Sequence, residues 1–394
     1  MLPALPFRLT LNRFRGRAGR PVLDPAGFAE AKAAITAWPG YAPTPLHDLP
    51  GLAAGLGVAA LRWKDEGGRF GLGSFKALGG AYAVARHLRQ TLAAEGVDAT
   101  DADLAAGHFA DRTRSVTVAC ATDGNHGRAV AWGAQRFHCR AVVFVHATVS
   151  AGRAEAIARF GAEVRRAGAT YDDAVRLCAE TAAREGWTVI SDTSWPGYEE
   201  IPRAVMQGYR LMAAEAFAQW RGDPPTHVFI QAGVGGAAAA VAAQAAATFG
   251  ERGPRVIVVE PMAFDGIARS LAAGRAVPSP PGPDTLMAGL ACAEPSPLAL
   301  EELLLRAEAA LGVPEEAVAP AMRLLARGVR GDPPVVAGES AVAGLIGLAL
   351  ARANRGAAMA LGLGPGSRVL LFGTEGATDP DLYARLVACP EAVA

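Results

Sequence analysis

Short apolar runs alternate with longer amphipathic segments along this chain, and this alternation constrains the fold more than any other feature. The runs at 116–121, His227–Gln231 and 256–260 are almost continuously apolar. A strand with one face in water would alternate apolar and polar residues, so these runs are typical of parallel strands buried on both faces. Parallel strands are joined through helices by right-handed crossovers. We therefore expect an α/β protein with mostly parallel sheets.

The same pattern gives the expected elements. Strands are predicted at 59–63, 116–121, 141–145, 187–191, 227–231, 256–260 and 369–372. Helices are predicted at 75–88, 126–137, 153–160, 171–185, 198–220, 236–249, 298–311, 315–327 and 339–355. The proline-rich stretch 278–284 predicts a surface loop.

Composition and charge exclude several classes of protein. Lysine and arginine together number 38, as do aspartate and glutamate, so no net charge favours nucleic acid or an anionic membrane. The longest apolar stretches are shorter than the ~18 residues of a membrane span. The arginine-rich N-terminal residues are interpreted as an exposed arm. The five cysteines are far apart and show no metal-binding spacing, which predicts a cytoplasmic setting and no metal site.

Lysine is scarce, so chemistry that needs an amine has few candidates. Only Lys32, Lys64 and Lys76 are present. Lys76 follows a glycine-rich stretch and Ser74, which suits a helix N-cap, so we expect Lys76 in the first turn of a helix. The helix dipole there disfavours a cation, and this lowers the pKa of an amine as a Schiff-base lysine requires.

Two further turns follow predicted strands, at the edge where ligands bind open parallel sheets. The first, Thr122-Asp123-Gly124-Asn125-His126-Gly127, carries polar side chains that suit either a ligand or helix capping. His126 is interpreted as a packed residue at a helix start. The second, Gly233-Val234-Gly235-Gly236-Ala237, combines flexible backbone with a helix N-terminus, which suits a phosphate group. Taken alone, it is equally compatible with a tight strand–helix turn.

A fourth turn follows the last strand and contains Thr374, which suits either a ring nitrogen or the cap of a following helix. A lysine, a phosphate loop, an asparagine and a hydroxyl residue together match the needs of pyridoxal 5′-phosphate. At these residues the chain resembles the diaminopropionate ammonia-lyase family, among the tryptophan-synthase-β-like enzymes of fold type II. The most specific segments are 64–80, 121–132, 191–209, 285–292 and 338–340.

The resemblance implies a role for each matching residue. Serine/threonine dehydratases of this fold have serine where this chain has Asp123, which favours the ammonia-lyase. Lys76 is expected to attach the cofactor and to act with Asp123 as a catalytic base. The expected cofactor contacts are Lys76, Phe75, Asn125, Gly233, Val234, Gly235, Gly236, Ala237 and Thr374. The candidate substrate contacts are Asp192, Tyr171, Ser74 and Thr122, although Asp192 also suits an N-cap.

The resemblance also implies architecture and activity. We expect two open, twisted, mostly parallel sheets: a large cofactor-binding domain of residues 1–80 and 200–394, and a small mobile domain of residues 81–199. The expected reaction converts D- or L-2,3-diaminopropionate to pyruvate and ammonia, in a cytoplasmic homodimer with no nucleic-acid or membrane partner. A serine/threonine dehydratase is the alternative, and a non-catalytic pyridoxal-phosphate-binding protein is a third possibility.

Overall fold

The computed structural model describes residues 2, 4–122 and 124–388, and the chain forms two compact units. The first unit comprises Met1–Leu23, Pro43–Ser74 and Met212–Ala394. The second comprises Asp24–Ala42 and Phe75–Leu211. The chain thus passes between the units more than once.

A seven-stranded sheet forms the centre of the first unit. Its order is β1-β10-β9-β8-β11-β3-β2, with β1 and β2 antiparallel to their neighbours and the other strands parallel. The strands are β1 (Arg8–Leu11), β2 (Leu46–Asp48), β3 (Ala60–Asp65), β8 (His227–Gln231), β9 (Arg255–Pro261), β10 (Ala309–Val313) and β11 (Arg368–Gly373). The antiparallel strands stand at the two edges, so the parallel strands occupy the buried interior.

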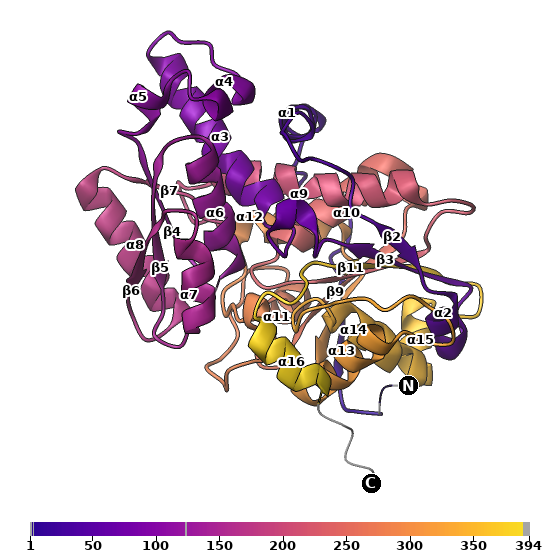
Figure 1. Cartoon of the computed structure of the whole chain (residues 1–394). Coiled ribbons are helices and arrows are strands. Elements are labelled where there is room, and N and C mark those ends of the chain that lie inside the picture. The colour runs from indigo at the N-terminus through magenta and orange to yellow at the C-terminus, as the bar shows by residue number, and fades with distance from the viewer. Residues whose placement is uncertain (1, 3, 123, 389–394) are drawn as a thin grey trace. The chain divides into compact units, whose positions relative to one another are not determined.

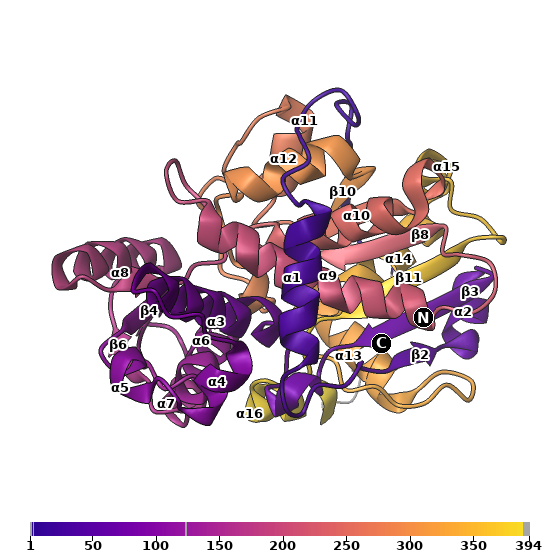
Figure 2. The same cartoon turned by 90° about the horizontal axis from the view of Figure 1, so that it is seen from above.

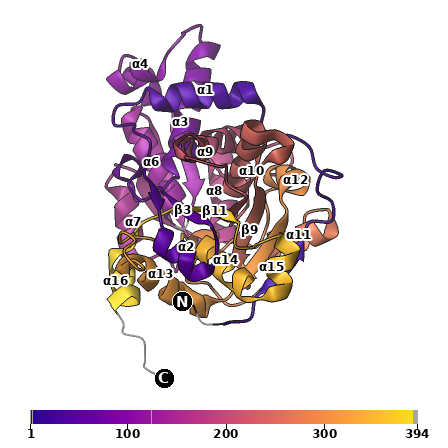
Figure 3. The ribbon, with the colours of Figure 1, turned by 90° about the vertical axis from the view of Figure 1, so that its right-hand side faces the viewer.

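Helices cover both faces of this sheet. α10 (Gly236–Phe249) and α12 (Pro297–Arg306) lie on one side, and α13 (Val318–Arg327) and α14 (Ala343–Ala353) lie on the other (Figure 1; Figure 3). The unit also contains α2 (Pro50–Leu56), α11 (Gly266–Ala273), α15 (Arg355–Leu361) and α16 (Pro380–Ala388), with 3₁₀ turns at Arg69–Gly71, Gly250–Arg252, Ala288–Leu290 and Glu315–Ala317. A helix packed on both sides is apolar all round, and α14 is buried from Ala343 to Ala351.

The second unit is built on a four-stranded parallel sheet. Its order is β6-β5-β4-β7, and the strands are β4 (Thr117–Ala121), β5 (Arg140–Val145), β6 (Glu163–Arg166) and β7 (Thr188–Val189). α8 (Tyr171–Glu185) covers one face, and α6 (Asn125–Arg136) and α7 (Ala151–Ala158) cover the other (Figure 2). The remaining helices are α1 (Pro25–Thr36), α3 (Ala77–Ala94), α4 (Asp101–Ala106), α5 (Ala110–Thr113) and the first part of α9 (Glu200–Gln219).

The predicted α/β class and mostly parallel sheets are confirmed, and one predicted helix is wrong. The helix expected at 298–311 ends at Arg306, and residues Ala309–Val313 form β10 between β1 and β9. The sequence Ala-Ala-Leu-Gly-Val continues the alanine- and leucine-rich pattern of α12. Every residue of β10 is buried, so its tertiary position overrides its local helix propensity.

The expected N-terminal arm is exposed at Arg13, Arg15, Arg17 and Arg20, but it is not a free arm, because the residues before them pair with the sheet. Arg8–Leu11 forms the antiparallel edge strand β1, and Arg8 forms an ion pair with Asp265 at 3.0 Å. The side-chain amide of Asn12 donates to the carbonyl oxygens of Leu303, Leu304 and Ala307, at 3.2, 3.0 and 2.9 Å. These carbonyls close the last turn of α12, so this segment both extends the sheet and caps a helix.

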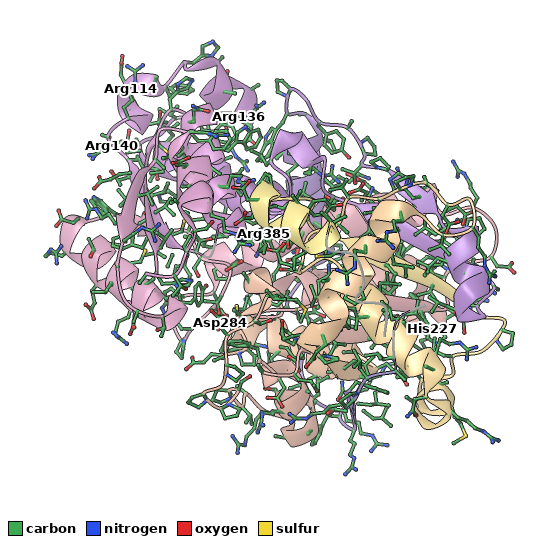
Figure 4. The ribbon with its side chains drawn as sticks, turned by 60° about the horizontal axis from the view of Figure 1, so that its bottom comes forward. Arg114, Arg136, Arg140, His227, Asp284 and Arg385 are labelled. Atoms are coloured by element: carbon green, nitrogen blue, oxygen red, sulfur yellow. The ribbon has the colours of Figure 1, made fainter. Side chains whose placement is uncertain are left out.

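The predicted surface loop and the predicted domain boundaries can also be compared with the structure. The stretch before Thr285 is an exposed surface loop, as predicted, and Figure 4 labels its Asp284. The expected domain boundary between residues 80 and 81 falls inside α3, and that between 199 and 200 falls at the start of α9. The domain boundaries and the mobility of the smaller domain stay predictions. Among the described residues, no helix has both the length and the apolarity to cross a membrane.

Gly208 packs so closely that we expect its replacement by alanine to destabilise the second unit. A Cβ atom there would overlap the carbonyl oxygen of Leu78, a backbone atom of α3 that cannot rotate away. The free energy of unfolding should fall by about 1–3 kcal/mol, the usual range for overpacking. Gly152→Ala on α7 is the control, because a Cβ at Gly152 meets nothing within 4 Å and alanine favours a helix. Equal thermal unfolding midpoints for the two variants would contradict this close packing.

Candidate functional site

Lys76 lies next to a buried carboxylate in the second unit. Lys76 stands at the N-cap of α3, and its Nζ is 2.5 Å from Oδ2 of Asp192. Burial by itself would raise the pKa of Asp192, but the Lys76 ammonium outweighs burial and holds that pKa well below the usual range. Asp192 is therefore an ionised carboxylate held against an amine. The expected N-cap role of Asp192 is wrong, because α9 begins at Glu200.

The other two lysines differ from Lys76 in their exposure to solvent. Lys32 is exposed on α1. Lys64 is fully buried in the first unit, where its Nζ donates to Glu215 at 2.7 Å and to the Thr44 carbonyl oxygen at 2.8 Å. An amine locked among these acceptors cannot reach a ligand, so the structure leaves Lys76 as the lysine suited to covalent chemistry.

His126 fixes the segment that carries Asp192. Its Nε2 is 2.8 Å from the carbonyl oxygen of Ile190, which can only accept, so Nε2 carries the hydrogen. Nδ1 then holds the lone pair of the neutral ring and lies 3.9 Å from Oδ2 of Asp192. Burial lowers the pKa of His126 despite the nearby Asp192 carboxylate. The interpretation of His126 as a packed helix-start residue is confirmed, and its hydrogen bond to Ile190 holds the segment that leads to Asp192.

Two aromatic rings lie beside the Lys76 amine. The rings of Phe75 and Tyr209 are 4.6 Å apart between centroids, and Nζ of Lys76 is 5.4 and 5.7 Å from those centroids. Both distances are within the range of cation–π attraction. Burial raises the pKa of Tyr209, so its phenol stays protonated at neutral pH.

The turn after β4 places Asn125 at the first position of α6. Thr122 is buried, and its hydroxyl oxygen accepts from the N–H groups of Gly124 and Gly127 at 2.9 and 3.1 Å. Thr122 therefore caps the helix locally, while Asn125 is half-buried and is not the N-cap residue. Asp123 lies outside the described residues, and its expected catalytic role stays a prediction.

Tyr171 and Ser74 occupy different settings from Lys76. Tyr171 is the half-buried first residue of α8, whose N-terminus is closed by a capping box of Thr170 and Asp173. Ser74, in the first unit, is buried and pairs with Glu375 in an isolated β-bridge. The expectation that Ser74 caps a helix is wrong, because α3 begins three residues later. Their expected substrate contacts stay predictions.

The predicted phosphate loop joins β8 to α10 in the first unit. Gly235 is the N-cap of α10 at φ +98°, and no side chain caps this helix. A Cβ at Gly233 would lie 2.9 Å from Sγ of Cys292 and 3.1 Å from the carbonyl oxygen of Gly289. Only glycine fits at both positions. The N-terminus of α10 therefore presents backbone N–H groups with no side-chain cap, and this arrangement binds phosphate.

Thr374 follows β11 in the same unit and is buried. Its hydroxyl oxygen accepts from Nε2 of Gln231, the last residue of β8, at 2.6 Å. Thr374 does not cap the following helix, because the cap of α16 is the Asp379 side chain, which accepts from the N–H of Leu382 at 3.1 Å. The alternative role of Thr374 as a helix cap is therefore excluded.

Two sequence segments that carry the resemblance are joined next to Thr374. The Ser340 hydroxyl oxygen accepts from the N–H of Gly289 at 3.1 Å, and the Ser340 N–H donates to Oε1 of Glu375 at 3.0 Å. The Gly338 N–H donates to the carbonyl oxygen of Glu375 at 3.0 Å. These bonds link the segment before α12, the segment before α14 and the turn after β11, and a backbone N–H group is the donor in each.

Each unit by itself carries part of what pyridoxal 5′-phosphate needs. The second unit has a half-buried amine between aromatic rings and a carboxylate. The first unit has glycine-lined N–H donors for a phosphate and a buried hydroxyl for a ring nitrogen. The donor set therefore fits this cofactor. No group of three His, Cys, Asp or Glu side chains in the described residues is arranged to hold a metal ion.

Gln231, Tyr209 and the linking role of His126 could not be found from motifs. Gln231 is the final residue of an apolar strand, and Tyr209 lies in the middle of a long helix. Gln231 and Tyr209 have partners more than a hundred residues away in the chain, and the partner of His126 is 64 residues away, so no local spacing indicates them. The position of Gln231 at the carboxyl end of a parallel strand was the one available signal.

Comparisons with known proteins agree with this geometry. A family model described as pyridoxal-phosphate dependent enzyme matches residues 37–372. A diaminopropionate ammonia-lyase of Salmonella typhimurium is 38% identical over 359 residues, covering 89% of each chain. The crystal structure of holo diaminopropionate ammonia lyase from Escherichia coli, with selenomethionine, has a TM-score of 0.90 at 36% identity and covers 98% of each chain.

The same Escherichia coli enzyme in complex with an aminoacrylate-PLP azomethine reaction intermediate has a TM-score of 0.86, at 36% identity and 98% coverage of each chain. A threonine dehydratase of Solanum lycopersicum matches a shorter stretch, with 31% identity over 160 residues, or 41% of this chain. The expected fold type and cofactor are confirmed. The chain belongs to the pyridoxal-phosphate-dependent enzymes and, among them, to the diaminopropionate ammonia-lyase family.

Proposed function

We propose that this protein is a carbon–nitrogen lyase that uses pyridoxal 5′-phosphate to eliminate ammonia from 2,3-diaminopropionate. The observation that carries the proposal is the ionised Asp192 carboxylate beside the Lys76 amine. Diaminopropionate differs from serine by a second ammonium group. A buried carboxylate that already pairs with one ammonium is a suitable partner for another.

The chain's own residues would hold the cofactor as follows. Lys76 supplies the amine that attaches it, and Phe75 and Asn125 contact it. The N–H groups of the Gly233–Ala237 loop bind its phosphate, and Thr374 faces its ring nitrogen. When bound, pyridoxal 5′-phosphate supplies an electron sink for the bond that breaks at the substrate Cα.

The reaction then needs a base on each face of the substrate and a partner for its second ammonium group. The Lys76 amine takes the Cα proton from one face of the substrate. Asp123 takes it from the other face, so that both enantiomers are accepted. Asp192 binds the ammonium group that leaves from Cβ, and Tyr171, Ser74 and Thr122 complete the substrate contacts. The enamine that remains takes up water, so one diaminopropionate and one water give pyruvate and two ammonia molecules.

Two other functions make different demands on these residues. A serine/threonine dehydratase expels a hydroxyl group, and its substrates have no second ammonium group for Asp192 to bind. A non-catalytic pyridoxal-phosphate-binding protein would not need a carboxylate held beside the Lys76 amine. The intact set of lysine, glycine loop and carboxylate favours the lyase over both.

The test is pyruvate release by the purified holoenzyme from D- and L-diaminopropionate, with D- and L-serine and threonine measured alongside. We expect pyruvate from both diaminopropionate isomers. Asp123→Asn should lower kcat/KM for the D isomer by about 10²–10⁴-fold, the usual contribution of one general base. The L isomer is the internal control and should change far less. Turnover of serine or threonine alone would assign the protein to the dehydratases.

We further propose that the enzyme is a cytoplasmic homodimer. Homodimers are implied by the resemblance to the family, and cysteines without metal or disulfide spacing favour a reducing compartment. Light scattering after gel filtration measures the mass in solution. A mass of about one chain of 40.5 kDa would contradict the dimer.

A further inference from the structure

Gln231 is the buried residue at the carboxyl end of β8, and its side chain faces three oxygen atoms. Its Nε2 is 2.6 Å from the Thr374 hydroxyl oxygen, 2.8 Å from the carbonyl oxygen of Phe372 and 3.3 Å from that of Ala341. Phe372 and Thr374 both belong to the end of β11 and the turn after it. One amide group thus holds the turn after β11 at the point where the chain leaves the sheet.

The two carbonyl oxygens decide which way the amide points. A carbonyl oxygen can only accept, so the atom that faces Phe372 and Ala341 must be the NH₂ group of Gln231. The reverse orientation would place Oε1 against two other acceptors. The observed orientation leaves Oε1 without a hydrogen-bond partner among the described residues, and a buried unpaired oxygen is costly. The amide therefore has one stable orientation in spite of this cost.

This orientation determines the direction of the Thr374 hydroxyl group. An amide NH₂ has no lone pair to accept with, so the Thr374 oxygen accepts from Gln231 and its own proton points elsewhere. The part of the chain that the structure describes provides no acceptor for that proton. Buried hydroxyl groups are normally paired, so a hydroxyl with a fixed and unused proton indicates an acceptor from outside the protein.

We propose that Gln231 is a positioning residue that makes Thr374 an obligate hydrogen-bond donor toward the cofactor's ring nitrogen. This inference rests on the proposed function, which places Thr374 at the cofactor nitrogen. Gln231 touches neither cofactor nor substrate and acts through Thr374.

The test compares two ligands and one substitution. Pyridoxal 5′-phosphate and its 1-deaza analogue, which has C–H in place of the ring nitrogen, are each bound to the wild-type protein and to Gln231→Met. We expect Gln231→Met to raise the Kd for pyridoxal 5′-phosphate about tenfold, the value of one well-formed hydrogen bond. The Kd for the deaza analogue should not change, because the analogue has no nitrogen for Thr374 to bond.

The control is Gln244→Met on α10. Gln244 is also buried, and its Nε2 donates to the Thr248 hydroxyl at 3.1 Å, so it repeats the Gln–Thr pair away from the sheet end. Gln244→Met should leave both Kd values within about twofold, a change well under one hydrogen bond. If Gln231→Met weakens both ligands equally, its role is merely structural and the proposal is overturned.

A second variant keeps the proposal testable if Gln231→Met folds poorly. Glu in place of Gln231 keeps the size, but its oxygens can accept from Thr374 and so release the hydroxyl from its fixed direction. Gln231→Glu should show the same selective loss for pyridoxal 5′-phosphate, and unchanged binding would overturn the proposal. Failure of the wild-type protein to bind pyridoxal 5′-phosphate at all would instead contradict the proposed function.

Discussion

Replacing Lys76 with alanine should abolish pyruvate release from diaminopropionate, with kcat/KM falling by at least about 10⁴-fold. The structure leaves no other lysine for the task, since Lys64 is buried among acceptors and Lys32 is exposed on α1. Loss of Lys76 removes the amine that attaches the cofactor and one of the two bases. Steady-state pyruvate formation and the visible absorbance of the bound cofactor both report the change.

Two control variants separate the amine from its charge. Lys32→Ala removes an exposed lysine and should leave turnover unchanged. Lys76→Arg retains a cation opposite Asp192 but has no amine that can attach the cofactor, so it should be as inactive as Lys76→Ala. Turnover by Lys76→Arg within tenfold of the wild type would refute the assignment of Lys76 as the attaching amine.

Replacing Arg69 with methionine should give the largest loss of stability, about 3–5 kcal/mol of unfolding free energy. Arg69 is buried and forms paired hydrogen bonds with both carboxylate oxygens of Glu66, each at 2.8 Å. It also donates to both oxygens of Glu215, at 3.0 and 2.7 Å. These carboxylates outweigh the effect of burial and raise the pKa of Arg69, so it stays charged. Its removal would leave the charge of Glu66 buried without its cation.

The measurement is urea unfolding of the first unit, followed by tryptophan fluorescence. Arg20→Met is the control, because Arg20 is an exposed residue of the same unit and its contact with Glu301 is 4.0 Å long. Such surface pairs contribute about 0–1 kcal/mol. A triple variant with Arg69→Met, Glu66→Gln and Glu215→Gln should recover part of the loss, since no buried carboxylate then lacks a partner. Equal stability of Arg69→Met and Arg20→Met would show that the buried cluster contributes little.

The regular interior of the fold could be predicted from periodicity, and its edges could not. The bounds of β8, α8 and α10 coincide with the sequence prediction, because buried strands and amphipathic helices leave an uninterrupted pattern. β6, with the sequence Glu-Val-Arg-Arg, is a short edge strand with exposed ends and carries no apolar run. Its strand character comes from pairing with β5, which no local pattern records.

The candidate site residues divide in the same way: motifs indicate some of them, and only the folded chain indicates how they pair. Lys76, Asn125, the glycine loop and Thr374 come from motifs, since each motif directly follows a predicted strand or glycine-rich turn. The pairing of Lys76 with Asp192 joins residues 116 positions apart. The orientation of Thr374 depends on Gln231, 143 positions earlier in the chain. Spacing within a motif indicates which residues take part, and only the folded chain sets their hydrogen-bond donors and acceptors.

The scarcity of lysine has a practical consequence for handling the protein. Reagents that acylate amines need an accessible, unprotonated side chain. Lys64 is sealed in the core, and Lys76 is held as the partner of Asp192, so Lys32 on the exposed face of α1 is the lysine side chain open to such reagents. A fluorophore or a surface linker carried by an active ester would therefore attach at one defined lysine and leave the amine of Lys76 intact.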